Sequence, residues 1–195
     1  AGFALFTLNL EDFKGSGIIN FAIPLLIFLG GIGFASLLNI FDSIRSRKNK
    51  LYLTTKIALV ISFSLIIIGM ILTLVLERNN LGTLAHLSLK DKLLASLFQS
   101  VSTRTAGFNT IAMGALTAPT LFTYIILMFI GASPGSTGGG IKTTTFGIVI
   151  LGVWSTLTNR QDIEIGKRRI GWDIFNKAIA ITLIALLYVT FVIFA

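Results

Sequence analysis

Two short stretches of this 195-residue chain place polar residues and glycines inside otherwise apolar sequence. The first is STRTAGFN, residues 102–109, which has no acidic side chain. Its available ligands are backbone carbonyls and the hydroxyls of Thr103 and Thr105. Oxygen ligands of this kind suit a weakly hydrated monovalent cation, whose hydration shell a ring of carbonyls can replace. Gly107 would let the backbone turn a carbonyl inward, and a plain turn glycine is the alternative with equal weight.

The second stretch is GASPGSTGGGIKTTT, residues 131–145, and it interrupts a long apolar run. As one helix, residues 120–158 would be roughly 58 Å long, about twice the ~30 Å hydrocarbon core of a bilayer. Pro134 lacks an amide hydrogen and residues 138–140 are glycines, so the helix should break here. Irregular backbone at membrane depth is tolerated only inside protein or beside a water-filled cavity. We therefore expect a cavity at this stretch.

The composition identifies the surrounding elements as membrane helices. The chain is 54% hydrophobic and 12% charged, against about 25% charged residues in a soluble domain. Residues 18–41 and 57–76 are uncharged and long enough to span a bilayer. The net charge of +8 gathers in 42–56 and 159–177, as in cytoplasmic loops, and not in a nucleic-acid-binding surface. The absence of cysteine excludes disulfides and thiolate chemistry.

The charge distribution also predicts a re-entrant helix. With both basic segments in the cytoplasm, residues 77–92 lie outside, and 93–158 must return inward. Ser88 and Asp91 resemble a capping box, and the leucines that follow have helical spacing. The predicted helix 89–102 is too short to span the membrane. The expected fold is therefore an all-α integral membrane protein, built from helix–re-entrant pore helix–helix repeats around a central pore.

A repeated order of motifs supports this architecture. AGF occurs at 1–3 and again at 106–108, and each copy precedes an apolar helix with a glycine kink. We expect the end of a second repeat at 1–52, with inner helix 18–41. A third repeat at 53–160 has outer helix 57–76, filter 103–109 and gate loop 132–140 within the broken inner helix 120–158. The start of a fourth follows at 161–195, so we expect an internal fragment of a longer protein.

TRTAGFNT together with SPGSTGGGIKTTT resembles the third repeat of the Trk/Ktr/HKT superfamily of potassium transporters, closest to the Ktr-type membrane subunit. AGFALF and GGIGF near the N-terminus resemble the filter and inner helix of its second repeat. The resemblance implies four repeats around one pore, each giving one filter glycine. It implies these potassium-binding residues in this chain: Gly2, Thr105, Ala106, Gly107 and Phe108.

The same resemblance implies that a flexible loop in the third inner helix is a gate below the filter. The matching residues are Ser133, Pro134, Gly135, Ser136, Thr137, Gly138, Gly139, Gly140 and Lys142. Lys142 would repel potassium near the cytoplasmic entrance, and snorkelling to the interface is the alternative. Arg104, a cation inside the membrane, is expected to support the filter by tying its backbone to a carboxylate or carbonyl.

The resemblance further implies a homodimer in the plasma membrane with a cytosolic nucleotide-binding regulatory subunit. The basic segments could dock that subunit or simply face lipid headgroups. No cofactor, catalytic residue, further metal site or nucleic-acid partner is expected. Potassium is the implied transported ion, with sodium as a coupling ion left open. Selectivity between the two depends on all four filter segments, of which this chain supplies two.

Three other readings compete with transport of potassium. GSTGGGIKT is superficially like a phosphate-binding loop, but Ile141 separates the glycine from Lys142 and the flanks are membrane-like. A broken-helix secondary transporter for another solute explains residues 131–145 but not a re-entrant helix followed by AGF. A purely structural membrane subunit gains nothing from an unwound polar centre. His86, Asp162 and Glu164 are interpreted as solvated surface residues.

Overall fold

The computed structural model describes residues 2, 4–45, 51–159, 163–165 and 168–195. These residues form helices almost throughout, which confirms the predicted all-α membrane fold. The α-helices are α1 (Gly17–Ile32), α2 (Phe34–Arg45), α3 (Leu53–Glu77), α4 (Leu89–Ser102), α5 (Ala118–Phe129), α6 (Thr143–Leu157) and α7 (Trp172–Phe194). The 3-10 helices are η1 (Glu11–Phe13) and η2 (Met113–Ala115), and the strands are β1 (Ile163–Ile165) and β2 (Arg168–Ile170).

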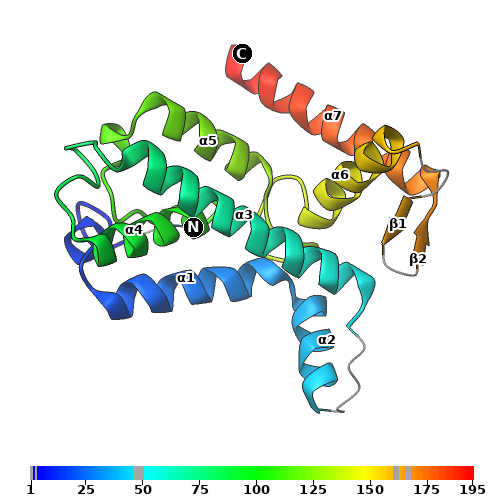
Figure 1. Cartoon of the computed structure of the whole chain (residues 1–195), viewed down its shortest axis with the longest axis horizontal. Helices are drawn as coiled ribbons and strands as arrows, with labels where there is room; N and C mark the ends of the chain where they lie inside the picture. The colour runs from blue at the N-terminus through cyan, green and yellow to red at the C-terminus, as the bar shows by residue number, and fades with distance from the viewer. Residues whose placement is uncertain (1, 3, 46–50, 160–162, 166–167) are drawn as a thin grey trace.

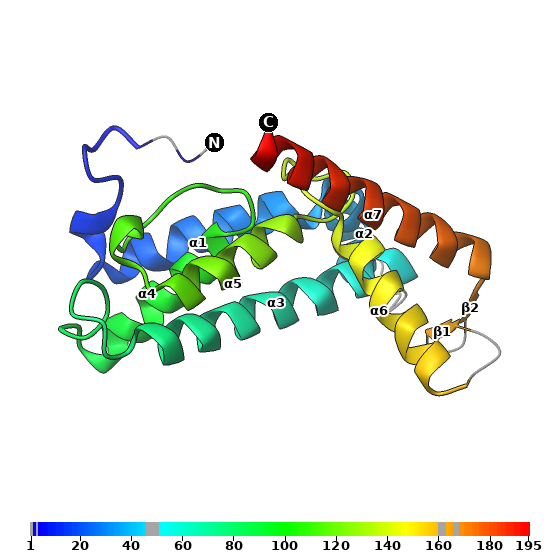
Figure 2. The ribbon, with the colours of Figure 1, turned by 90° about the horizontal axis from the view of Figure 1, so that it is seen from above.

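The helices divide into two groups along the long axis of the molecule. Helices α1, α3, α4 and α5 run alongside one another, while α6, α7 and the hairpin gather at the opposite end (Figures 1 and 2). Helices α3 and α7 are long and apolar enough to cross a membrane, and α1 with α2 forms a third candidate span if the bent pair is counted as one. The remaining apolar helices, α5 and α6, are shorter than a span.

The prediction of one inner helix over 18–41 is wrong. The helix breaks at Gly33, and α2 leaves the axis of α1 at 99° (Figure 1). Gly33 has a φ of 89°, in the left-handed region that a helix cannot contain. The glycine-rich sequence GGIGF therefore divides the predicted helix into two helices that run in different directions.

Helix α4 enters beside one end of α3 and stops at its middle. Near its start, Ala95 packs with Leu84 and Ile111. Further on, the Ser100 hydroxyl donates to the Ile66 carbonyl of α3 over 2.7 Å. The chain then reverses, and by Thr117 it is back at Glu77, the last residue of α3. Helix α4 thus descends about half the length of α3 and the following segment returns to the same end, which is the path of a re-entrant helix.

A glycine in α3 allows this close packing. A Cβ atom built at Gly69 would lie 2.8 Å from Leu127 Cδ1 of α5 and would also collide with the Ser100 hydroxyl of α4. Gly69 therefore lies where α3, α4 and α5 approach one another most closely. On the same face of α3, the Thr73 hydroxyl and the Tyr124 hydroxyl share a hydrogen bond of 3.0 Å within the buried interior.

The second basic segment, 159–177, contains an element that the sequence analysis missed. Strands β1 and β2 form an antiparallel hairpin in which Ile163 pairs with Ile170. Both isoleucines are buried with Phe175 against α6 and α7. The alternation of apolar and charged residues in IEI, residues 163–165, was the available signal. Parts of both basic segments lie outside the described residues: 46–50, 160–162 (with Asp162) and 166–167.

Glu77 joins the end of α3 to the start of α5. Its Oε1 accepts hydrogen bonds from the Thr117 amide at 2.9 Å, the Thr117 hydroxyl at 2.7 Å and the Thr120 hydroxyl at 2.6 Å. Its Oε2 accepts from Asn80 Nδ2 at 2.6 Å and the Thr83 hydroxyl at 2.7 Å. The carboxylate is fully buried and serves as the cap that α5 lacks in its own sequence.

We predict that Glu77→Gln destabilises the full-length protein that carries this chain. The amide would turn an NH₂ group toward donors on one side of the cluster, and a buried donor left unpaired costs about 1–3 kcal/mol. Thermal unfolding of the purified protein in detergent measures the loss. The matched control is Asp12→Asn, an exposed carboxylate. Equal melting temperatures for the two variants would contradict the structural role of Glu77.

Candidate functional site

The AGF turn, residues 103–109, connects the end of α4 to the returning segment through backbone in left-handed conformations. Gly107 has a φ of 82° and Thr105 a φ of 64°. A β-branched residue with positive φ is uncommon and is held only where the surroundings fix it. Gly2, in the other AGF sequence, has a φ of 63°. The glycines of the two motifs therefore share a left-handed backbone conformation.

The two AGF glycines lie against each other. A Cβ atom at Gly2 would collide with the backbone of Gly107, so only glycine fits. Asn9, missed in the sequence analysis, spans the contact: its Nδ2 donates to the Gly2 carbonyl at 3.5 Å and to the Gly107 carbonyl at 3.4 Å. The backbone amide of Asn109 donates to Asn9 Oδ1 at 3.4 Å. Asn9 itself has a φ of 56°, a conformation in which asparagine is enriched.

The candidate ligands in the AGF turn are not equally available. The Thr103 hydroxyl is buried and donates to the Ser100 carbonyl over 2.7 Å, closing the end of α4. The Phe108 carbonyl accepts a hydrogen bond from the Ser102 hydroxyl. Of the two threonine hydroxyls predicted as ligands, only that of Thr105 lies on a cavity. Among the described residues, the Thr105 and Ala106 carbonyls accept no hydrogen bond, whereas the Gly107 carbonyl accepts one from Asn9 Nδ2.

Arg104 finds its partners among backbone carbonyls. Its Nη1 donates to the Ser62 carbonyl of α3 at 3.1 Å, and its Nη2 donates to the Gly131 carbonyl at 3.5 Å. The sequence analysis left a carboxylate or a carbonyl open, and carbonyls are what the structure has. The arginine thus contacts three elements: the AGF turn that carries it, α3, and the segment between α5 and α6.

That segment, residues 130–142, is here called the glycine loop. Its two ends are joined by backbone hydrogen bonds: the Ile141 amide donates to the Phe129 carbonyl at 3.0 Å, and the Thr143 amide to the Ala132 carbonyl at 3.3 Å. A Cβ atom at Gly131 would collide with the Gly139 carbonyl. The loop therefore begins and ends at nearly the same point, and its narrow neck requires glycine.

Polar side chains fold the glycine loop onto itself. Lys142 Nζ donates to the Gly138 carbonyl at 2.7 Å. The Ser133 and Thr143 hydroxyls share a hydrogen bond of 3.0 Å, and the Ser136 hydroxyl donates to the Ser133 carbonyl at 2.5 Å. Ser133 and Thr143 are fully buried, whereas Pro134, Gly135 and Thr137 are exposed. One side of the neck, from Gly131 to Ser133, is thus enclosed by protein, whereas Gly139, Gly140 and the tip reach a surface of this chain.

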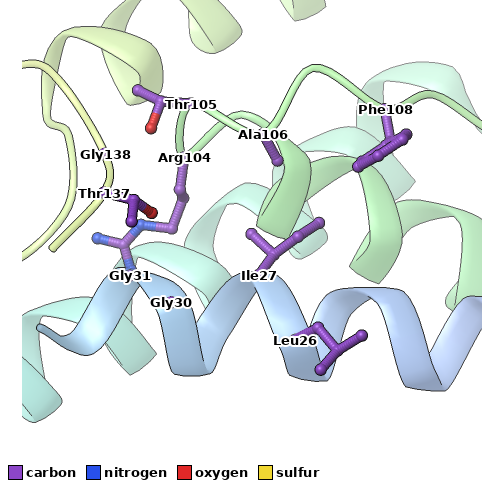
Figure 3. A pocket seen from close by; sticks show the side chains of 10 residues that line it. All are labelled: Leu26, Ile27, Gly30, Gly31, Arg104, Thr105, Ala106, Phe108, Thr137 and Gly138. Carbon is purple, nitrogen blue, oxygen red and sulfur yellow. The ribbon is translucent and has the colours of Figure 1, made fainter. Parts of the chain in front are cut away.

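A cavity of about 160 Å³ lies between the AGF turn, α1 and the glycine loop. The AGF turn contributes Arg104, Thr105, Ala106 and Phe108; α1 contributes Leu26, Ile27, Gly30 and Gly31; and the loop contributes Thr137 and Gly138. Figure 3 shows the Arg104 side chain reaching from the turn toward Thr137 and Gly31. A Cβ atom at Gly138 would lie 2.7 Å from the Thr105 hydroxyl, so the loop packs directly against the turn where both line the cavity.

The structure therefore brings most of the predicted residues together. Gly2 meets Gly107, and the side chains or backbone of 104–106 and 108 share one cavity with Thr137 and Gly138. Lys142 lies at the loop's end and points back to it. Two contributors were missed, Asn9 and Gly33. The sequence signal for each was a residue type suited to positive φ: Asn9 follows the first AGF sequence by a few residues, and Gly33 interrupts the predicted inner helix 18–41.

Comparison with known proteins shows the family to which this chain belongs. A family model described as TrkH, cation transport protein, matches residues 1–195. The Ktr system potassium uptake protein B of Bacillus subtilis is 40% identical over 100% of this chain and 43% of its own length. That of Vibrio alginolyticus is 36% identical over 95% of this chain and 41% of its own. The potassium/sodium uptake protein NtpJ of Enterococcus hirae is 33% identical over 97% of this chain and 40% of its own length.

The fold has a solved counterpart. The crystal structure of the potassium transporter TrkH from Vibrio parahaemolyticus matches 97% of this chain and 41% of its own chain, with a TM-score of 0.73 and 22% identity. That likeness bears on the fold alone. The chain spans about two fifths of the length of these relatives. With its apolar spans, it is part of a multi-pass protein of the plasma membrane. Because the family model matches every residue, the chain belongs to the TrkH family of cation transport proteins, as the AGF and glycine-loop motifs predicted.

Proposed function

We propose that this chain forms half of a potassium-uptake pore, in which the AGF turns are selectivity-filter segments and the glycine loop is the gate. Its relatives in Vibrio alginolyticus and Bacillus subtilis are potassium uptake proteins, which supports potassium as the transported ion. The observation that carries the proposal is the cavity itself, with the AGF turn on one side and the glycine loop on the other. A dehydrated cation leaving the carbonyls of the turn would meet the loop next.

The chemistry of the cavity wall supports a monovalent ion. Among the described residues that line it there is no carboxylate, so a divalent ion would lack the charged oxygen ligands that calcium and magnesium prefer. Backbone carbonyls and the Thr105 hydroxyl provide neutral oxygens suited to an alkali metal ion. Both potassium and sodium fit this description, and sodium belongs to the proposal as a second ion because one relative is named a potassium/sodium uptake protein.

The geometry supports gating by displacement of the glycine loop. Its paired ends form a neck, so the tip can move while α5 and α6 remain in place. Lys142 is proposed to hold the loop closed through its bond to the Gly138 carbonyl, in addition to adding positive charge. Arg104 is proposed to support the filter by fixing the AGF turn to α3 and to the loop. A second copy and a cytosolic nucleotide-binding subunit complete the proposed assembly, as the family resemblance implies.

The first prediction concerns Gly107. In the full-length protein, Gly107→Ser should weaken growth of a potassium-uptake-deficient strain at low potassium, because serine resists a φ of 82° and strain of this kind costs about 1–2 kcal/mol per residue. Gly114→Ser is the matched control, since nothing lies within 4 Å of a Cβ there. Equal growth of the two variants would mean that Gly107 has no filter role.

The second prediction concerns the loop as a whole. Deleting residues 133–140 joins Ala132 to Ile141, which the backbone pairing of the neck already holds close together. Potassium uptake into depleted cells should rise, because the cavity loses its obstruction. The protein level in the membrane must be measured in parallel. An unchanged maximal rate at equal protein level would count against the gate.

The third prediction separates two roles of Lys142. Lys142→Gln should raise uptake by about threefold to tenfold, because it replaces a charged donor to the Gly138 carbonyl and such bonds exceed neutral ones in strength. Lys142→Arg retains a charged donor and should stay near the parent rate. If Lys142 only snorkels to the interface, the two variants will transport at the same rate.

A further inference from the structure

The break between α1 and α2 is filled by the tip of the glycine loop, although the two are about 100 residues apart in the sequence. The Ser133 amide donates to the Gly31 carbonyl at 2.9 Å, and the Phe34 amide donates to the Gly135 carbonyl at 3.1 Å. Helix ends leave such carbonyls and amides without partners inside the helix. The loop supplies one partner to each side of the break.

Only glycine fits at position 33, where the loop contacts the break. Its φ of 89° is in the left-handed region, and a Cβ atom built on it would collide with the Pro134 carbonyl and lie 3.3 Å from the Gly135 carbonyl carbon. Both the conformation and the space therefore exclude a side chain. No comparable contact constrains Gly17 at the start of the same inner helix, where a Cβ would meet nothing within 4 Å.

We propose that the α1–α2 break is the seat of the glycine loop, and that Gly33 is the positioning residue that lets the loop sit there. The proposal rests on the gating function above and adds what holds the gate shut: backbone bonds to the neighbouring repeat. When the loop leaves, the Gly31 carbonyl and the Phe34 amide lose their partners. The closed gate and the 99° bend therefore stabilise each other.

The seat gives the gate a mechanical connection to the cytoplasmic side. Helix α2 runs from the break to Arg45, at the edge of the first basic segment. The Asn39 side chain accepts a hydrogen bond of 2.9 Å from the Tyr52 amide at the start of α3. A partner that pulled or rotated α2 would change the geometry of the Phe34 amide, and with it the bond to the loop. The same two-state element would thus respond to the gate and to a cytoplasmic ligand.

The first test is a reversible cross-link in the full-length protein. An ideal Cβ at Gly31 lies 3.8 Å from Ala132 Cβ, close to the mean Cβ separation of a disulfide, and residues 1–195 contain no cysteine. The double variant Gly31→Cys with Ala132→Cys should therefore cross-link on mild oxidation, seen as loss of maleimide labelling. Rubidium uptake should then fall and return with reductant, while each single-cysteine variant stays insensitive to both treatments.

The second test uses Gly33→Ala, with Gly17→Ala as the matched control on the same helix. Gly33→Ala should unseat the loop and raise uptake on the order of tenfold, since two backbone hydrogen bonds are lost. In the protein lacking 133–140 the same substitution should add nothing, because the atoms it would displace are gone. Gly17→Ala should leave uptake at the parent level in both backgrounds.

The outcomes separate the seat from the gate. If deletion of the loop leaves uptake unchanged, the gating function fails. A second outcome is that the deletion raises uptake while the cysteine pair fails to cross-link, or cross-links without lowering uptake. Either result would support the gating function and contradict the proposal that the loop sits in the α1–α2 break. An effect of Gly33→Ala that persists undiminished in the loop-deleted protein would also overturn the seat, since it would arise from the helix break alone.

Discussion

Backbone amides and carbonyls inside a membrane need protein partners, and this requirement governs the centre of the molecule. Between α5 and α6 the chain is unwound over residues 130–142, so its polar groups cannot satisfy one another as in a helix. They are paired across the neck of the loop, with Arg104 and Lys142, and with the broken ends of α1 and α2. The loop and the break are complementary because each supplies what the other lacks.

Close approach of backbone to backbone makes this pairing possible. Gly2 meets Gly107, Gly33 meets Pro134, and Gly131 meets Gly139, and at each contact a Cβ atom would collide with main-chain atoms. Backbone cannot yield as the end of a flexible side chain can, so these glycines are steric requirements and not only flexible positions. Two of the three contacts join the N-terminal part of the chain, at Gly2 and Gly33, to residues more than 100 positions later. Near the cavity these close approaches are therefore between main-chain atoms, whereas the packing at Gly69 is against the side chains of Ser100 and Leu127.

The sequence was informative wherever the determinant is local. Helix α4 has the bounds expected from Ser88, Asp91 and the leucine spacing, because a cap and a periodic face are properties of neighbouring residues. The glycine loop could be predicted from Pro134 and the glycines that follow. The separation of α1 from α2 could not be predicted in this way, because an uncharged run of this length indicates one membrane span. The bend is also stabilised by contacts with a loop about 100 residues away in the sequence. The partners of Arg104 escaped prediction for a related reason: they are carbonyls, which leave no signature in side-chain sequence.

The positions of Arg104 and Lys142 explain how a cation pathway can contain two cationic side chains. Arg104 donates to the Ser62 and Gly131 carbonyls, and Lys142 donates to the Gly138 carbonyl. Each bond turns a carbonyl dipole toward a fixed positive charge, and in a low-dielectric interior such bonds are strong. The same carbonyl cannot at that moment be a good ligand for a passing ion. In the proposed closed state the loop thus obstructs the cavity sterically and also withholds the oxygens that would make its neck attractive to potassium. Because Arg104 also donates to the Ser62 carbonyl of α3, the proposed filter would keep that support when the proposed gate opens.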